Sequence, residues 1–374
     1  MSHPARFGIV SYNRYGNFTN YGSALQSWAL KTAVNRLGEG RWESVLVNYC
    51  PDCLLDKDPL NPMKNMWDKD PEARRLCELT LPTIRVNYEK FCRFFETQFQ
   101  NTSRRYTSDN FSVCAEQEHF SGIICGSDTI FCVNEFGIDD GFYANYPCMR
   151  DRSVAYAASF GDAQFTPEQE PVLQSRLQNF RAIALRENMM LPYVRKHVSV
   201  PCARVIDPTL LLDVQDYAPI TAQKQEEEPY LLLYARRYNP AMEAFAEKLA
   251  AENGWKIIEI SLRADNVKKH RMFYEAGVEE FLSLVKHAAF VITNSYHGMI
   301  FSVQHRRPFY LFSREQCDNK IEELLSLLGL SSRLLITGSE ADFAPIDYEA
   351  AHTAIRRARQ DSLVFLNQSL ESLL

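Results

Sequence analysis

Short apolar segments rich in β-branched residues alternate with longer amphipathic segments along most of the chain. This alternation predicts strands joined by crossover helices, and therefore an α/β protein with largely parallel sheets. In the first half, the pattern predicts strands at 7–12, 45–47, 122–125, 153–158, 182–186 and 204–206, and helices at 21–37, 167–180 and 188–197. Between 54 and 110 charged and aromatic residues replace the alternation, which we interpret as a helical insertion with a helix at 88–99.

A polar linker at 221–229 separates this half from a second series of the same kind. There the pattern predicts strands at 230–235, 256–260, 290–293 and 308–312, and helices at 240–253, 278–287, 296–305 and 316–328. We therefore expect an N-terminal α/β domain over 1–220 and a C-terminal Rossmann-like domain over 229–345. A last helix within 346–374 is expected to pack back on the N-terminal domain. In such folds a ligand binds beyond the carboxyl ends of the strands.

Composition narrows the classes of function. The 374 residues carry a formal charge of -6, which argues against a nucleic-acid partner, because such binding needs a clustered cationic surface. No apolar run approaches the roughly 18 residues of a membrane span, and no secretory segment begins the chain, so we expect a cytoplasmic protein. The ten cysteines are scattered as reduced thiols would be. Cys50 and Cys53 have the spacing of a redox pair or half a zinc site, but no second pair follows.

The segment 288–303 is the most informative for chemistry. An apolar strand ends at Asn294 and Ser295, both good N-caps, and the helix that follows contains Gly298, which would let a ligand approach the backbone. The free amides and dipole of a helix start predict an anion site. His297 would stand at its edge, able to donate a hydrogen bond to phosphate or to move a proton near neutral pH. A histidine with only a capping role is the alternative.

Other candidate residues also follow strands directly. Arg186 ends one strand of the first half, and Arg236 and Arg237 end the first strand of the second half, where a guanidinium faces the cleft and can hold a phosphate or carboxylate. Pairing with a neighbouring carboxylate on the surface is the alternative. Asp128 would serve as a proton acceptor or as a helix N-cap. We interpret Asp207 as a turn residue that ends the first domain.

Several common motifs are absent from the contexts that they require: the P-loop, the dinucleotide-binding glycine motif, the zinc-protease helix and the hydrolase nucleophile elbow. Six segments, taken in order, instead resemble the polysaccharide pyruvyl transferase family: 20–26 (NYGSALQ), 126–128 (GSD), 156–161 (YAASFG), 185–187 (LRE), 207–212 (DPTLLL) and 294–298 (NSYHG). The resemblance extends over about residues 7–330. Six motifs in register are specific, although each one alone is weak.

The resemblance implies a fold similar to GT-B glycosyltransferases, with two Rossmann-like domains facing across a cleft, and neither a cofactor nor a metal. The typical reaction of the family moves pyruvate from phosphoenolpyruvate to two hydroxyls of a sugar, which gives a cyclic ketal and phosphate. The histidine and arginine that the family implicates in donor binding or catalysis fall here on His297 and Arg186. The acceptor would be a sugar or a lipid-linked oligosaccharide of bacterial surface polysaccharide biosynthesis, with peripheral membrane contact if it is lipid-linked.

On this basis, we assign catalytic roles to His297, as the acid or the hydrogen-bond donor to phosphate, and to Asp128, as the base. We expect the donor to contact Arg186, Arg236, Asn294, Ser295 and Gly298, and the acceptor to contact Asn20, Tyr21 and Ser127.

The sequence departs from the family pattern at two places: Asn294 stands where an acidic residue is usual, and 129–131 reads TIF where the family commonly has Gln and Trp. Both departures bear on the acceptor more than on the reaction class. Two other functions stay open, a nucleotide-sugar glycosyltransferase on the same scaffold and a non-catalytic module that binds anionic glycans.

Overall fold

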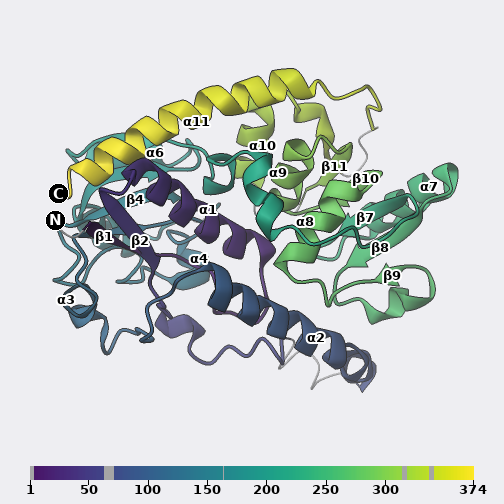
Figure 1. Cartoon of the computed structure of the whole chain (residues 1–374), viewed down its shortest axis with the longest axis horizontal. Coiled ribbons are helices and arrows are strands. Elements are labelled where there is room, and N and C mark those ends of the chain that lie inside the picture. The colour runs from purple at the N-terminus through teal and green to yellow at the C-terminus, as the bar shows by residue number, and fades with distance from the viewer. Residues whose placement is uncertain (1–3, 63–70, 163, 314–317, 337–340) are drawn as a thin grey trace.

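The computed structural model describes residues 4–62, 71–162, 164–313, 318–336 and 341–374. Within these residues the chain forms two sheets of six strands each, and all the strand pairs are parallel. One sheet belongs to the N-terminal half and the other to the C-terminal half (Figure 1). The prediction of an α/β protein with two Rossmann-like domains is confirmed.

The N-terminal sheet has the order β2-β1-β3-β4-β5-β6. Its strands are β1 (Ala5–Val10), β2 (Trp42–Leu46), β3 (Gly122–Cys125), β4 (Ser153–Ala158), β5 (Phe180–Leu185) and β6 (Cys202–Arg204). Its helices are α1 (Tyr21–Gly38), α2 (Pro71–Gln98), α3 (Cys114–Gln117), α4 (Val133–Phe136), α5 (Gln169–Leu177) and α6 (Leu191–His197). The strand order reverses between β1 and β3, so the topological switch point of this sheet lies there.

The C-terminal sheet has the order β12-β11-β10-β7-β8-β9, which is the order of a doubly wound dinucleotide-binding fold. Its strands are β7 (Tyr230–Tyr234), β8 (Lys256–Ile260), β9 (Arg271–Met272), β10 (Phe290–Thr293), β11 (Phe309–Phe312) and β12 (Leu334–Leu335). The helices are α7 (Pro240–Asn253), α8 (Val278–His287), α9 (Tyr296–Gln304), α10 (Asp318–Leu327) and α11 (Tyr348–Glu371). Here the switch point lies between β7 and β10.

The predicted strands correspond to observed ones, but some helices differ from prediction. The helix of the insertion, α2, begins at Pro71 and not near residue 88, and it contains Pro82. A charged first half and an internal proline hide the helical period of that segment in the sequence. The two-residue strands β9 and β12 were not predicted, because segments of that length carry no periodic signal. Residues 316 and 317 of the predicted helix at 316–328 lie outside the described residues.

Helix α1 lies in the N-terminal half and reaches the boundary with the C-terminal half at one end (Figure 1). Fourteen of its residues are buried, and it contacts β2 on one side and α8 and α9 on the other. Tyr21 stacks on Phe281 of α8 with ring centroids 4.6 Å apart, and its hydroxyl donates to the carbonyl of Ala276 at 2.8 Å. One apolar cluster therefore continues from the N-terminal domain into the C-terminal domain. A continuous apolar interface of this kind holds the domains in a defined relation.

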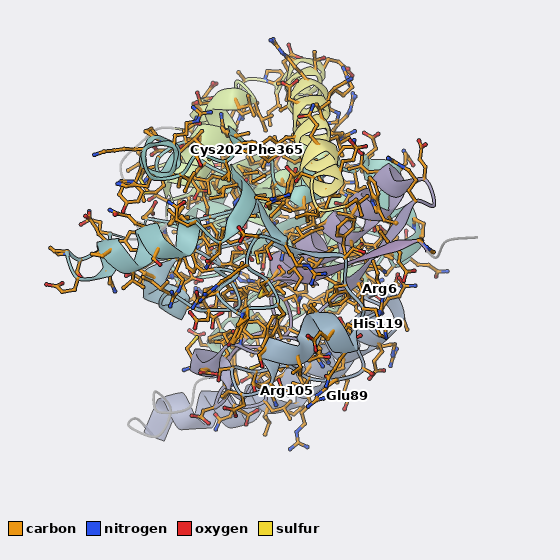
Figure 2. All side chains as sticks on the ribbon, turned by 90° about the vertical axis from the view of Figure 1, so that its left-hand side faces the viewer. Arg6, Glu89, Arg105, His119, Cys202 and Phe365 are labelled. Carbon is orange, nitrogen blue, oxygen red and sulfur yellow. The ribbon has the colours of Figure 1, made fainter. Side chains whose placement is uncertain are left out.

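Helix α11 returns from the C-terminal half and crosses the N-terminal half, so that the two termini lie near each other (Figure 1). It contacts α1 and β4, and the Ser362 hydroxyl accepts a hydrogen bond from the Ile206 backbone amide at 3.0 Å. Figure 2, turned by 90°, shows α11 at the top of the N-terminal half, where the labelled Phe365 is one of the partly buried side chains packed on the apolar cluster. Helix α11 thus provides a second connection between the two domains, in addition to the interface at α1.

Candidate active site

A cavity lies where the switch points of the two sheets face each other. Tyr12 follows β1, Asp128 follows β3, Arg236 follows β7 and His297 follows β10, and all four side chains line the same cavity. Switch points are the preferred ligand sites of open α/β sheets, so the two domains present these sites to one another. The cavity has a volume of about 190 Å³ and is lined by Tyr12, Asn20, Asp128, Thr129, Glu135, Arg186, Arg236, Arg237, Ser295, Tyr296, His297 and Lys320.

Two helices begin at the wall of this cavity. Asn20 caps α1, and its Oδ1 accepts hydrogen bonds from the amides of Gly22 and Ser23 at 3.1 and 3.3 Å. Ser295 caps α9, and its Oγ accepts from the Gly298 amide at 3.2 Å. Both capping residues line the cavity. The positive ends of two helix dipoles therefore favour an anion in it.

His297 reaches across the domain boundary. Its ring lies against Gly22 of α1 so closely that a Cβ atom at Gly22 would be 2.0 Å from Nδ1. On its other side, Nε2 lies 3.4 Å from Oδ2 of Asp207 and forms no well-shaped hydrogen bond within the described part of the chain. The imidazole is thus held by packing on Gly22 and by one carboxylate, and it forms part of the cavity wall.

Asp207 is the carboxylate on which both halves of the site converge. Its Oδ2 accepts from Nη1 of Arg186 at 2.8 Å and faces His297, while its Oδ1 accepts from the amide and hydroxyl of Thr209 at 2.9 and 2.6 Å. Burial alone would raise the pKa of Asp207, but the charges of His297 and Arg186 and the Thr209 hydroxyl lower it well below its usual range. The interpretation of Asp207 as a turn residue was therefore incomplete, because only one of its oxygens serves the turn.

Asp128 is positioned by a backbone turn that directly follows β3. Gly126 has a φ of +155°, and a Cβ there would lie 2.0 Å from the carbonyl oxygen of Tyr156, so the turn requires glycine. The Asp128 carboxylate accepts from the Ser23 hydroxyl at 2.6 Å. Burial would raise the pKa of Asp128, but the cationic groups of Arg186, His297 and Lys320 outweigh it and lower the pKa. Asp128 is therefore ionised at neutral pH, suited to orienting a hydroxyl and only weakly basic.

Arg186 is buried, with a side chain that is 1% exposed. Its guanidinium bonds Asp207, lies 3.8 Å from Asp128 and stands 4.8 Å from the centroid of the Tyr296 ring. Burial would lower its pKa, but Tyr296 and the surrounding carboxylates raise it. Its Nε and Nη2 have no hydrogen-bond partner among the described residues. A permanent cation with unused donors fits the clamp role that the sequence suggested.

Asn294 fixes the loop that carries the other arginines. Its Oδ1 accepts from the Arg236 amide at 2.7 Å, and its Nδ2 donates to the Arg237 carbonyl at 2.7 Å. The Arg236 guanidinium then reaches across to the Thr19 carbonyl of the N-terminal domain at 3.4 Å. The side chain of Asn294 is consequently committed to this loop, and it is absent from the cavity lining.

Three more of the predicted binding residues do not line the cavity. Tyr21 points into the domain interface, as described above. Ser127 is fully buried, and its Oγ accepts from the neighbouring Asp128 amide at 2.5 Å. At Gly298 an added Cβ would lie 2.7 Å from Oγ1 of Thr293, so the glycine permits close packing on β10 and does not open the backbone to a ligand. By contrast, one cavity brings together six of the predicted site residues: His297, Asp128, Arg186, Arg236, Ser295 and Asn20.

Five lining residues carried no prediction: Tyr12, Thr129, Glu135, Tyr296 and Lys320. Tyr12 and Thr129 come directly after β1 and the β3 turn, so the rule that strand ends carry ligands would have found them. The Glu135 carboxylate accepts a hydrogen bond from the Thr129 hydroxyl at 2.7 Å, six residues earlier in the chain. Lys320 lies in the first turn of α10, and no local pattern in the sequence distinguishes it from other helix lysines.

Among the described residues, no three His, Cys, Asp or Glu side chains are grouped so that they could hold a metal ion. Cys50 and Cys53 are both free thiols, the first buried and the second exposed. No helix in the described ranges combines the length and apolar character needed to cross a bilayer.

Two facing Rossmann-like domains with a cavity between them define a GT-B-like architecture. The sequence model of the family described as polysaccharide pyruvyl transferase matches residues 20–316. This match covers most of the chain, and the chain therefore belongs to that family. The resemblance noted in the sequence is confirmed, and membership supports a transferase that modifies polysaccharides.

Solved structures with the same fold include UDP-N-acetylglucosamine 2-epimerases. The enzyme from Methanocaldococcus jannaschii is 10% identical, with a TM-score of 0.54 over 94% of this chain and 92% of the other. The putative enzyme from Listeria monocytogenes is 9% identical, with a TM-score of 0.51 over 98% and 91%. The one from Rickettsia bellii is 10% identical, with a TM-score of 0.51 over 100% and 96%. At such identities the likeness concerns the fold alone. Comparison with curated proteins finds no match.

Proposed function

We propose that this protein transfers pyruvate from phosphoenolpyruvate to two hydroxyls of a sugar and releases phosphate. In this reaction the enol methylene gains a proton and becomes a methyl group, and the central carbon forms two bonds to sugar oxygens. The bond from that carbon to the phosphate oxygen breaks. Of the two hydroxyl protons, one balances the methyl group and the other leaves with phosphate. Ketal formation of this kind needs an acid, an anion clamp and an acceptor for hydroxyl protons.

The observation that carries the proposal is the convergence of His297 and Arg186, from opposite domains, on the single carboxylate of Asp207. A carboxylate behind an imidazole orients the ring, which suits His297 to deliver a proton from a fixed position. Arg186 faces the same cavity and can hold the donor while positive charge develops at its central carbon. Asp128, fixed by the Ser23 hydroxyl, is our candidate to accept a hydrogen bond from the attacking sugar hydroxyl.

The size and charge of the cavity favour this donor over a nucleotide sugar. Its volume of about 190 Å³ is small beside the roughly 300–1,000 Å³ of typical sites for larger ligands. Two helix starts and several cationic side chains suit a compact molecule with a phosphate and a carboxylate. The likeness to UDP-N-acetylglucosamine 2-epimerases concerns the fold and gives no separate support to a nucleotide-sugar reaction.

The test is phosphate release from phosphoenolpyruvate with a panel of acceptor sugars, for wild type, His297→Ala and His297→Gln. We expect both variants to lose turnover by about 100-fold or more, because neither a methyl group nor an amide can deliver the proton. His197→Gln on the outer helix α6 is the matched control and is expected to retain wild-type turnover. Thermal stabilisation by a nucleotide sugar and not by phosphoenolpyruvate would refute the proposal. Unchanged turnover in His297→Ala would remove His297 from the mechanism.

A further inference from the structure

Three residues of the cavity lining have no part in the proposed function: Tyr12, Thr129 and Glu135. Tyr12 follows β1, and the other two follow β3 in the segment that also carries Asp128. The Tyr12 ring packs on Phe136 with ring centroids 5.1 Å apart, so the segments after β1 and β3 meet at the cavity. Because Asp128 is the candidate to contact the attacking sugar hydroxyl, we call these three residues and Asp128 the acceptor wall.

Thr129 links the two carboxylates of the acceptor wall. Its amide donates to Oδ1 of Asp128 at 3.0 Å, and its hydroxyl donates to Oε2 of Glu135 at 2.7 Å. Thr129 is buried, whereas Glu135 is exposed. The Glu135 carboxylate is thus held at one oxygen, and its Oε1 forms no hydrogen bond within the described part of the chain. Residues 129–131 are also a place where the sequence departs from the family pattern, which points to acceptor selectivity.

Glu135 differs from the other carboxylate of the wall because no cation pairs with it among the residues that the structure describes. Asp128, by contrast, lies 3.8 Å from Arg186. Burial raises the pKa of the Tyr12 hydroxyl, and the charge of Arg236 acts against this rise. The charges of Asp128 and Glu135 add to it. The Tyr12 hydroxyl therefore stays protonated, able to donate a hydrogen bond to a sugar oxygen beside two carboxylates.

A bound donor would change the balance of charge in the cavity. Four lysine or arginine side chains and two carboxylates line it, so the empty cavity attracts anions. Phosphoenolpyruvate brings a carboxylate and a phosphate, which together carry about two and a half to three negative charges. The donor then outweighs the excess of cations, and an acceptor would enter beside the unpaired carboxylate of Glu135. A second carboxylate on the acceptor would be repelled by both the donor and Glu135.

We propose that Glu135 is a specificity-determining residue, which selects an uncharged sugar as the acceptor and rejects a sugar that carries a carboxylate. The inference rests on the proposed function and deepens it by naming the class of acceptor. Specificity of this kind combines an attractive contact with a repulsive one. The Glu135 carboxylate can accept a charge-assisted hydrogen bond from a sugar hydroxyl, and it repels an acidic group at the same place. Thr129 is a positioning residue, because it holds this carboxylate at one oxygen.

The experiment compares wild type with Glu135→Gln, which removes the charge at the same size, and with Glu135→Asp, which keeps it. Glu170→Gln is the matched control, because Glu170 is exposed at the start of α5 and does not line the cavity. The probes are pairs of methyl hexosides and methyl hexuronides of the gluco, galacto and manno series. The two members of a pair differ only in the terminal carbon, so the loss of its hydroxyl is common to every protein and cancels between them.

Each probe is measured as a competitor of the best acceptor of the sugar panel, by phosphate release at saturating phosphoenolpyruvate. For a probe that is itself an acceptor, kcat/KM replaces the inhibition constant. We expect Glu135→Gln to bind hexuronides about tenfold or more tightly than wild type does, because the like charge is gone. It should bind hexosides about two- to tenfold more weakly, because an amide makes a weaker hydrogen bond than a carboxylate. A general loss of structure would not produce changes of opposite sign.

Glu135→Asp should keep the preference for hexosides, and Glu170→Gln should match wild type. If Glu135→Gln leaves the ratio of hexuronide to hexoside binding within about twofold of wild type, the inference is refuted while the proposed function stands. If it weakens both kinds of probe alike, Glu135 serves every acceptor and the role in selectivity is wrong. A wild-type preference for hexuronides would also refute the inference. If wild type releases no phosphate from phosphoenolpyruvate with any sugar, the proposed function itself fails and the inference fails with it.

Discussion

The contact between Gly22 and His297 gives a test of how the two domains build the site. An alanine at position 22 would place its Cβ 2.0 Å from Nδ1 of His297, and the ring is buried, so the imidazole must move. Gly22 lies in the first turn of α1, and alanine is favoured over glycine in a helix by up to about 1 kcal/mol, the full value applying to the interior. Any loss of stability in Gly22→Ala therefore comes from the clash and not from the helix.

The two effects have opposite signs, and this sets the expected magnitudes. Overpacking in a well-packed interior destabilises by about 1–3 kcal/mol. Gly22→Ala should then lower the free energy of unfolding by about 0–3 kcal/mol after the gain in helix propensity. In a His297→Ala background the clash is absent, so Gly22→Ala should raise the free energy of unfolding by up to about 1 kcal/mol. The coupling between the two positions is thus expected to be about 1–3 kcal/mol.

Urea unfolding of wild type, both single variants and the double variant measures this coupling. In parallel, phosphate release from phosphoenolpyruvate should fall by about 100-fold or more in Gly22→Ala, because a displaced imidazole no longer lies beside Asp207. A stability effect of Gly22→Ala that is the same in both backgrounds, within about 0.5 kcal/mol, would show that the ring does not pack on Gly22. Full turnover in Gly22→Ala would show that this position of the ring is not the active one.

Three further substitutions test the charges of the molecule. Asp207→Asn breaks a buried ion pair and should lower the free energy of unfolding by about 3–5 kcal/mol. The loss should be the same at every pH from about 5 to 8, because the lowered pKa of Asp207 keeps it ionised throughout. If urea unfolding shows the loss at only one end of that range, this prediction is wrong. Arg186→Lys keeps the charge but has a single nitrogen, which cannot bond Asp207 and also place donors where Nε and Nη2 stand. We therefore expect kcat/KM for phosphoenolpyruvate to fall by about tenfold or more, and an unchanged value would argue against the clamp. Burial raises the pKa of Asp139 from 3.8 to about 6, so the folded protein retains a proton that the unfolded chain has lost between these values, and wild type loses stability as the pH rises through this window. Asp139→Asn, which keeps an acceptor for the amides of Gly141 and Phe142, should remove up to about 3 kcal/mol of that pH dependence, whereas parallel stability curves for the two proteins would contradict the shift.

The residues that sequence reasoning could find are those at the ends of buried strands. Arg186, Arg236, His297 and Asp128 each follow a short apolar segment directly, and the carboxyl ends of parallel strands meet at one edge of a sheet. Their presence in one cavity required only that the two halves face each other, which the family resemblance implied. Fold class and cavity location were therefore accessible from the sequence.

The sequence could not predict the direction of side chains that are oriented by contacts with a distant segment or with the other domain. Tyr21 follows a helix cap near the cleft and was expected to meet the acceptor, but packing on Phe281 turns it into the interface. Asp207 satisfies a local turn with one oxygen, and nothing nearby in the sequence shows that the other oxygen meets His297. Lys320 reaches the site only because α10 packs beside Tyr296. In each case the missing information is a contact between segments far apart in the chain.

The first turn of α1 shows how such contacts set the site as a unit. Asn20 closes the helix start, Tyr21 enters the C-terminal domain, Gly22 leaves room for His297, and Ser23 holds Asp128. In an α-helix, neighbouring residues rise by about 1.5 Å and turn by a fixed angle, so these four positions cannot be adjusted independently. A shift of α1 would change the distance between His297 and the Asp128 carboxylate. It would change the packing of the two domains at the same time. Docking of the two domains and assembly of the catalytic groups are consequently the same structural event, and we expect substitutions in this turn to affect both stability and turnover.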